Sequence, residues 1–176
     1  MSLTVILQRN ILNYKTIAEI EIKGKRIVVK DSMIMLDDDE ISPEWPCLNV
    51  ESGTYTIEVN MYNEDICSSV IVKKVGKTFS SKTEIGSVDV DHGSIGIIDY
   101  DNFLTAVQNN YDEYEEWTSG PLDDVAWEKF FGKIDFKNEP LYFLHSGEGD
   151  GTYPIYELIE NNKVIGFECE FIPKDA

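Results

Sequence analysis

The sequence predicts an α+β fold, a mainly antiparallel β-sandwich or curled sheet with a two-helix insertion at about residues 100–134. Strand-like alternation of apolar and polar residues fills much of residues 16–75 and returns after residue 139. Only one helical stretch lies between these regions, which argues against a doubly wound parallel sheet. The length of 176 residues fits a single domain over 1–176, because domains usually contain about 100–200 residues.

The N-terminal half predicts two hairpins. Residues 16–22 and 26–30 alternate in the strand manner on either side of Gly24, so we expect them to pair. Residues 53–62 and 66–75 form the second expected pair. The stretch between the hairpins holds the acidic run Asp37 to Glu40 and two prolines, which predict a solvated loop because proline does not fit a central strand.

The middle of the chain changes from strand to helix. Two short apolar runs flank an expected turn at residues 91–93, and Asp99 then stands at an expected helix N-cap. Apolar and aromatic residues follow at spacings of three and four, as in an amphipathic helix: Tyr100, Phe103, Leu104, Val107, Tyr111, Tyr114 and Trp117. Glycine and proline within residues 119–121 predict its end. A second helix is expected over about residues 122–134.

The C-terminal part returns to strands. Residues 140–146 form one candidate strand, and residues 153–160 and 163–171 form a candidate pair. Asn161 and Asn162 lie between the last two, and asparagine is a common residue of tight hairpin turns. The sequence therefore predicts a closing hairpin.

Acidic residues are unevenly distributed. The chain has 33 acidic and 15 basic residues, a formal net charge of −18. Between Glu84 and Glu128 there are 12 acidic residues and no lysine or arginine. This charge argues against nucleic-acid binding through phosphate contacts and favours encounter with a basic partner protein. The alternative is that the acidic surface only keeps the protein soluble.

Cysteine usage and hydropathy indicate a cytoplasmic protein. Cys47, Cys67 and Cys169 are odd in number, widely spaced and free of any C-x-x-C pattern, which argues against a disulfide framework and a structural zinc site. No apolar run approaches the roughly 18 residues of a membrane span. The first ten residues lack the pattern of a secretion signal. We expect no membrane association and no cofactor.

The end of the first expected helix is the candidate partner-binding site. Packing of its aromatic stripe against the sheet is the ordinary expectation. Acidic residues are interleaved with the aromatic ones here, a composition that also suits a protein interface. The candidate residues are Tyr111, Asp112, Glu113, Tyr114, Glu115, Glu116 and Trp117.

Two turns rich in glycine and aspartate, "VDVDHGS" and "HSGEGDGTYP", contain the two histidines of the chain. If the fold brings the turns together, a divalent metal could use five side chains: Asp89, Asp91, His92, His145 and Asp150. The alternative is ordinary turn chemistry, because tight turns need the same residues. The turns match no EF-hand, phosphate-binding loop or nucleophile elbow, so no catalytic residue is assigned.

The same two motifs carry a resemblance. "VDVDHGSIGIID" and, further on, "SGEGDGTYPIYELIENNKVIGFECEF" resemble a pattern of uncharacterised bacterial and phage-associated proteins, with a V-D-x-G turn and a C-terminal S-G-x-G-D-G-x-Y-P-V-Y motif. The similarity covers about residues 87–171, and here Ile155 stands in place of the usual valine. It implies a small, β-rich cytoplasmic domain and no established activity.

These observations favour a non-enzymatic acidic protein of the immunity or anti-defence type, which binds and inhibits a basic partner protein. Two alternatives stay open. One is a small-ligand or metal-dependent enzyme built on the two Gly/Asp-rich turns. The other is a DNA mimic, whose carboxylates would be spaced like phosphates on one face.

Overall fold

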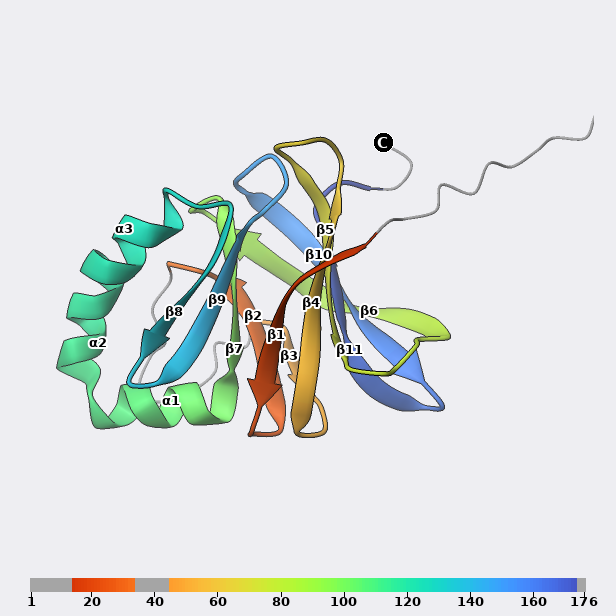
Figure 1. Cartoon of the computed structure of the whole chain (residues 1–176), viewed down its shortest axis with the longest axis horizontal. Coiled ribbons are helices and arrows are strands. Elements are labelled where there is room, and N and C mark those ends of the chain that lie inside the picture. The colour runs from red at the N-terminus through yellow and green to blue at the C-terminus, as the bar shows by residue number, and fades with distance from the viewer. Residues whose placement is uncertain (1–13, 34–44, 174–176) are drawn as a thin grey trace, which may run out of the picture.

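Antiparallel pairing organises the strands into two sheets (Figure 1). The structure is a computed structural model, and it describes residues 14–33 and 45–173. The six-stranded sheet has the order β1 (Lys15–Ile22), β4 (Gly53–Met61), β5 (Cys67–Lys74), β11 (Lys163–Glu170), β10 (Gly151–Glu160), β6 (Ser81–Val90). The five-stranded sheet has the order β3 (Cys47–Asn49), β2 (Arg26–Asp31), β7 (Ser94–Asp99), β9 (Glu139–His145), β8 (Phe131–Phe136).

The helices form a third layer (Figure 1). They are α1 (Tyr100–Asn109), α2 (Tyr111–Trp117), the π-helical segment η1 (Thr118–Leu122) and α3 (Asp123–Ala126). They cover the face of the five-stranded sheet that points away from the six-stranded sheet. The expected α+β fold, a mainly antiparallel pair of sheets with a helical insertion, is confirmed.

Strand β2 contributes side chains to two cores, one on each face of its sheet. Ile27 and Val29 lie in the core between the two sheets, whereas Val28 lies in the second core, beneath the helices. Successive side chains of a strand point to opposite faces, so a strand buried on both faces needs a continuous apolar run. The central strand β7 is buried in the same way along its whole length.

The first predicted hairpin is wrong. β1 pairs with β4, and β2 pairs with β3 and β7, so the chain crosses from one sheet to the other at Gly24. Apolar residues of both strands face the same core from opposite sides. The Asp99 carboxylate holds the crossing, because its Oδ2 accepts hydrogen bonds from the backbone N–H groups of Lys23 (2.7 Å) and Gly24 (2.9 Å).

A second crossing joins β6 to β7. The expected turn at residues 91–93 is present, but its two flanking runs belong to different sheets. β6 pairs with β10, and β7 pairs with β2 and β9. The turn is held by the buried carboxylate of Asp31, described below.

The helical prediction needs three corrections. The helix is interrupted at Asn110, and it does not end at residues 119–121, where a π-helical segment contains Pro121. The second helix ends at Ala126, because residues 131–136 form β8, which pairs with β9 through a turn at Lys137 and Asn138. Both turn residues have positive φ, as a two-residue hairpin requires. None of the helices in the described residues has the length and apolar character of a membrane span.

Two expected hairpins are confirmed, β4–β5 and β10–β11. Asn161 and Asn162 have φ of 50° and 62°, which suits the tight turn between β10 and β11. Cys67 and Cys169 are buried and unpaired, and Cys47 is half-buried and unpaired. The expected loop at Asp37 to Glu40 lies outside the described residues.

Candidate functional site

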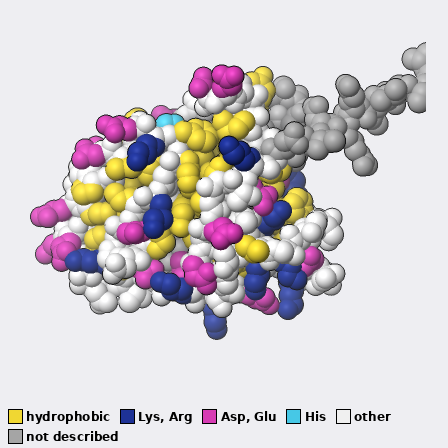
Figure 2. Space-filling model, in the orientation of Figure 1, with side chains coloured by type: hydrophobic (Ala, Val, Ile, Leu, Met, Phe, Trp, Pro, Cys, Tyr) yellow, Lys and Arg dark blue, Asp and Glu magenta, His cyan; other side chains and the backbone are white. Residues whose placement is uncertain are grey.

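The outer surface of the helices is strongly acidic. Figure 2 shows acidic side chains along the edge of the molecule at which α2 lies. We call this surface the acidic helical layer and define it by seven residues between Tyr111 and Glu128: Asp112, Glu113, Glu115, Glu116, Asp123, Asp124 and Glu128. All are exposed except the half-buried Asp123. Among the described residues, only Glu113 of this set forms an ion pair with a lysine, Lys137.

The aromatic residues of the predicted partner site face inward. Tyr114 and Trp117 are 1% and 9% exposed, and their rings stack with centroids 5.8 Å apart. Both also contact the ring of Phe136 from β8. Tyr111 is half-buried against the same core. The aromatic stripe therefore packs as an ordinary amphipathic face, and only Asp112, Glu113, Glu115 and Glu116 present a surface to a partner.

One exposed aromatic residue was missed by the sequence analysis. Trp127 follows α3 and is 63% exposed, and its indole Nε1 donates a hydrogen bond to Asp123 Oδ1 at 2.7 Å. The exposed charged residues within three positions of it in the chain are Asp124, Glu128 and Lys129. The sequence spacing indicates that Trp127 is exposed. Leu122 and Ala126 are four residues apart and form the buried side of this helical segment, and Trp127 does not lie on that side.

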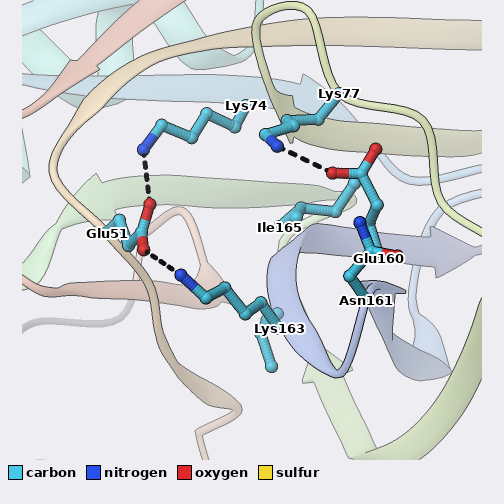
Figure 3. Close-up of a pocket in the computed structure, with 8 residues that line it drawn as sticks. Glu51, Lys74, Lys77, Glu160, Asn161, Lys163 and Ile165 are labelled. Carbon is cyan, nitrogen blue, oxygen red and sulfur yellow. Dashed lines mark hydrogen bonds and ion pairs between the residues drawn. The ribbon is translucent and has the colours of Figure 1, made fainter.

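A lysine-lined cavity lies at the common end of β4, β5, β10 and β11 (Figure 3). Its volume is about 190 Å³, and we call it the lysine cavity. Its lining comprises three lysines, two glutamates and three uncharged residues: Lys74, Lys77, Lys163, Glu51, Glu160, Asn161, Val164 and Ile165. Its residues come from three separate parts of the chain, so no local sequence pattern predicts it.

Two tight turns place the lysines of this cavity. Lys74 and Lys77 flank a turn that is closed by a hydrogen bond from Lys77 N to Lys74 O (3.1 Å), with Gly76 at φ 75°. Glu160 and Lys163 are opposite each other at the ends of β10 and β11, on either side of the Asn161 and Asn162 turn. Both turns therefore bring charged side chains to the same end of the sheet.

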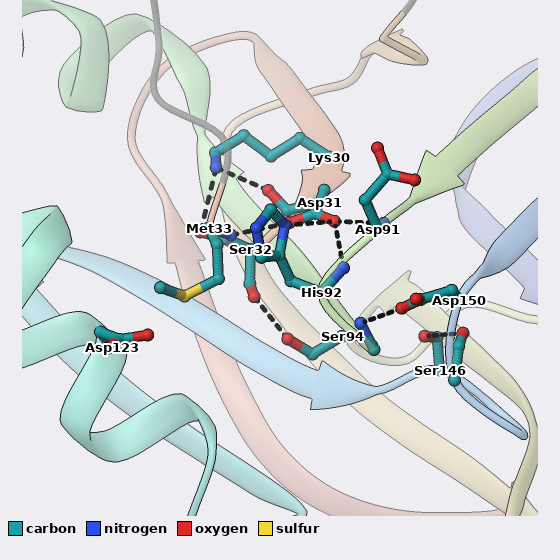
Figure 4. Close-up of polar contacts among 12 residues, drawn as sticks. Lys30, Asp31, Ser32, Met33, Asp91, His92, Ser94, Asp123, Ser146 and Asp150 are labelled. Atoms are coloured by element: carbon teal, nitrogen blue, oxygen red, sulfur yellow. Dashed lines mark hydrogen bonds and ion pairs between the residues drawn. The ribbon is translucent and has the colours of Figure 1, made fainter.

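The two Gly/Asp-rich turns meet in space (Figure 4). The backbone N–H of Gly93 donates to Asp150 Oδ1 (2.9 Å), and the backbone N–H of Ser146 donates to the carbonyl oxygen of Gly93 (3.0 Å). Ser146 Oγ in turn donates to the carbonyl oxygen of Gly149 (2.8 Å). These bonds connect the crossing between β6 and β7 to the loop between β9 and β10.

The predicted metal ligands are not brought together. Asp89 Oδ1 accepts a hydrogen bond from Thr152 (2.6 Å), and His145 Nε2 lies 3.2 Å from the carbonyl oxygen of Ala126. His92 Nδ1 lies 3.2 Å from the carboxylate oxygens of Asp31. Within the described part of the chain, no group of three or more His, Cys, Asp and Glu side chains could hold a metal ion. The turn-chemistry alternative accounts for these bonds.

Asp31 is the buried centre of this region. Its side chain is fully buried, and Oδ2 accepts hydrogen bonds from the backbone N–H groups of Asp91 (2.7 Å) and His92 (3.0 Å). Oδ1 accepts a third from the backbone N–H of Met33 (2.9 Å). The carboxylate thus replaces a missing backbone partner at the turn, as side-chain oxygens commonly do.

Lys30 is a second buried charged residue that the sequence analysis missed. Its Nζ donates to the carbonyl oxygens of Asp31 (2.8 Å) and Ser32 (3.2 Å) (Figure 4). It also lies 5.8 Å from the ring centroid of Trp45. Burial lowers its pKa to about 7, because the charged form loses its hydration. The signal in the sequence was the strand period, since Lys30 follows Val28 by two residues on the helix-covered face.

Comparison of the chain with protein-family models, with curated proteins and with solved structures gives no match. The resemblance of residues 87–171 to bacterial and phage-associated proteins stays a prediction, and the function has to be argued from the surface of the molecule.

Proposed function

We propose that the protein is a non-enzymatic binding protein whose acidic helical layer receives a basic partner protein. Inhibition of a basic toxin or nuclease, as in an immunity or anti-defence protein, is the role that we propose for it. The observation that carries the proposal is the exposed indole of Trp127 among Asp123, Asp124 and Glu128. Tryptophan is among the residues that contribute most to binding energy at protein interfaces.

The charge distribution supports this choice. The acidic helical layer has seven carboxylates, one of which pairs with a lysine among the described residues. Uncompensated charges of one sign speed the encounter with an oppositely charged protein. An indole beside carboxylates also offers a face for a lysine or arginine of the partner, because cations bind over aromatic rings.

The enzyme alternative has less support. Three side chains of the two Gly/Asp-rich turns form hydrogen bonds or close polar contacts within the fold: Asp89 with Thr152, His92 with Asp31 at the end of β2, and Asp150 with the backbone N–H of Gly93. Within the described residues, no group of three or more His, Cys, Asp and Glu side chains could hold a metal ion. A small-ligand or metal-dependent reaction at these turns is therefore not our proposal.

Affinity capture tests the proposed surface. The wild-type protein, immobilised, is incubated with host lysate at low salt, next to Trp127→Ala and Asp124→Lys. We expect wild type to retain a basic protein that both variants lose, and we expect retention to weaken steeply with salt. Glu64→Lys, at the exposed β4–β5 turn, changes the charge by the same amount away from the layer and should retain the protein.

Equal retention by all four proteins would refute the proposed surface. A competition experiment then separates the DNA-mimic alternative. If the retained protein binds duplex DNA and the duplex displaces it from the acidic helical layer, the carboxylates occupy its DNA site. If the duplex does not displace it, the retained protein binds the acidic helical layer through a surface other than its DNA site.

A further inference from the structure

The lysine cavity concentrates positive charge in an otherwise acidic protein. Three lysines and two glutamates line it, whereas the whole chain has a net charge of −18. Figure 3 shows the side chains of Lys74 and Lys163 converging on Glu51, whereas Lys77 Nζ is paired with Glu160 Oε2 at 2.8 Å. Charges beyond about 10 Å are largely screened at 0.1 M salt, so an anion in this cavity senses the lysines more than the distant acidic helical layer.

Glu51 occupies the space between two of the lysines. Its Oε2 lies 2.9 Å from Lys74 Nζ, and its Oε1 lies 3.2 Å from Lys163 Nζ. Hydrogen bonds from these two lysines lower the pKa of Glu51 to about 2. One carboxylate therefore satisfies two ammonium groups as an external anion would.

The exposure of Glu51 allows an external anion to take its place beside the lysines. Its side chain is 60% exposed and precedes β4 in a connecting segment. Exposed ion pairs contribute little to stability, since both groups are well hydrated when apart. Glu160, by contrast, is 22% exposed and also accepts a hydrogen bond from the backbone N–H of Thr78 (3.2 Å). Glu51 is thus the more exposed of the two carboxylates and has no backbone N–H donor among the hydrogen bonds described.

We propose that the lysine cavity is a binding site for a phosphate group and that Glu51 is the internal anion that the phosphate displaces. A phosphate carries more charge than the carboxylate and offers three or more oxygens to Lys74, Lys77 and Lys163. Lysine binds phosphate as a strong point charge. The cavity of about 190 Å³ exceeds the roughly 30 Å³ of one water molecule several times, so a phosphate group fits.

This inference is independent of the acidic helical layer, which comprises other residues on other elements. A negative result at one surface leaves the proposal for the other surface unaffected. The phosphate group could belong to a small soluble molecule or to a lipid headgroup, and the site would recognise both by the same chemistry.

Titration with inorganic phosphate tests the site. Amide chemical shifts of Gly76, Lys77, Asn161 and Asn162, which belong to the two turns, report binding at constant low ionic strength. We expect saturable shifts at these amides. Glu51→Gln should bind phosphate about fivefold more tightly, because it removes the competing carboxylate and its exposed ion pairs. A purely structural Glu51 would show no gain in affinity.

Lysine variants locate the binding. In the Glu51→Gln background, Lys163→Met should weaken phosphate binding at least fivefold, and Lys133→Met, another exposed lysine, should leave it unchanged. Thermal unfolding of each variant checks that it is folded. No shift at the four amides, no gain with Glu51→Gln, or equal losses with the two lysine variants would overturn the proposal.

The source of the phosphate is distinguished by a second measurement. Vesicles of phosphatidylcholine with and without phosphatidic acid are sedimented with the Glu51→Gln protein. Cosedimentation only with phosphatidic acid, lost in Lys163→Met, assigns a lipid headgroup. Binding of inorganic phosphate without cosedimentation assigns a soluble phosphate compound.

Discussion

The fully buried Asp31 accepts a hydrogen bond from the backbone N–H of His92 at 3.0 Å, while the imidazole Nδ1 of His92 lies 3.2 Å from the same carboxylate. A residue at the end of β2 therefore fixes the turn at which the chain passes from β6 to β7. We expect Asp31→Ala to lower the free energy of unfolding by about 3 kcal/mol or more, because three backbone N–H groups lose a charged acceptor.

Urea denaturation measures this change. Asp91→Ala is the matched control, since the Asp91 side chain is exposed and only its backbone N–H contacts Asp31. It should change stability by less than about 0.5 kcal/mol. Equal losses in the two variants would contradict the role that we assign to the Asp31 carboxylate.

Gly24 is required at the crossing between β1 and β2. A Cβ atom at this position would lie 2.5 Å from Asp99 Oδ1 and 2.8 Å from Asp101 Oδ2. We expect Gly24→Ala to destabilise the protein by about 1–3 kcal/mol, because both carboxylates would have to move. Gly120→Ala is the control, since no atom of the described residues outside its two chain neighbours and its own helix backbone lies within 4 Å of its Cβ position. Thermal unfolding of both variants decides the point, and an unaffected Gly24→Ala would disprove the close approach.

Truncation of the two tryptophans near the helices should lower stability by different amounts. Trp117→Ala removes a ring that is 9% exposed and should cost about 3–5 kcal/mol of stability. Trp127→Ala removes a ring that is 63% exposed and should cost less than about 1 kcal/mol. Denaturant unfolding of the two variants measures both values. A large loss at Trp127 would mean that this indole supports the fold, and its use as a partner contact would lose its basis.

Lys30 should make stability depend on pH in a definite direction. Its pKa is about 7 in the folded protein and 10.5 in an ordinary lysine, so the unfolded chain binds more protons between these values. The contribution of Lys30 to the free energy of unfolding therefore rises with pH across this window, by on the order of a few kcal/mol, and this gain disappears as the pH falls to 7. Lys30→Met should flatten this rise in urea titrations at pH 7 to 10. Lys133→Met, at an exposed position, should keep it, and an unchanged slope in Lys30→Met would contradict the assignment.

The sequence predicted the elements whose partners are adjacent in the chain. The β4–β5 and β10–β11 pairs followed from alternation around a short turn, and α1 followed from its spacing and from Asp99 at the N-cap. It did not predict which strands change sheet. Alternation is the same for two strands of one hairpin as for two strands that face each other across a core, and at Gly24 the choice depends on Asp99, far away in the sequence.

Strand β8 was mistaken for helix for a related reason. Phe131 to Phe136 follows a helical stretch without a proline, and only the positive φ of Lys137 and Asn138 turns it back along β9. The same difference between local and long-range information applies to the two candidate surfaces. Local composition identified the acidic helical layer, but the lysine cavity joins Glu51 to Lys74 and Lys163, which no local pattern connects.

The order of strands in the six-stranded sheet has a consequence for synthesis of the chain. β5 and β11 are hydrogen-bonded neighbours, with Val70 opposite Cys169, so within the described six-stranded sheet the N-terminal strands β1, β4 and β5 pair with the C-terminal strands through these two strands alone. During synthesis we therefore expect one edge of β5 to lack its partner strand until β11 has emerged, because pairing of segments distant in the sequence forms slowly. Unpaired strand edges are prone to aggregate, so we expect the nascent chain to be most exposed to aggregation before this sheet is complete.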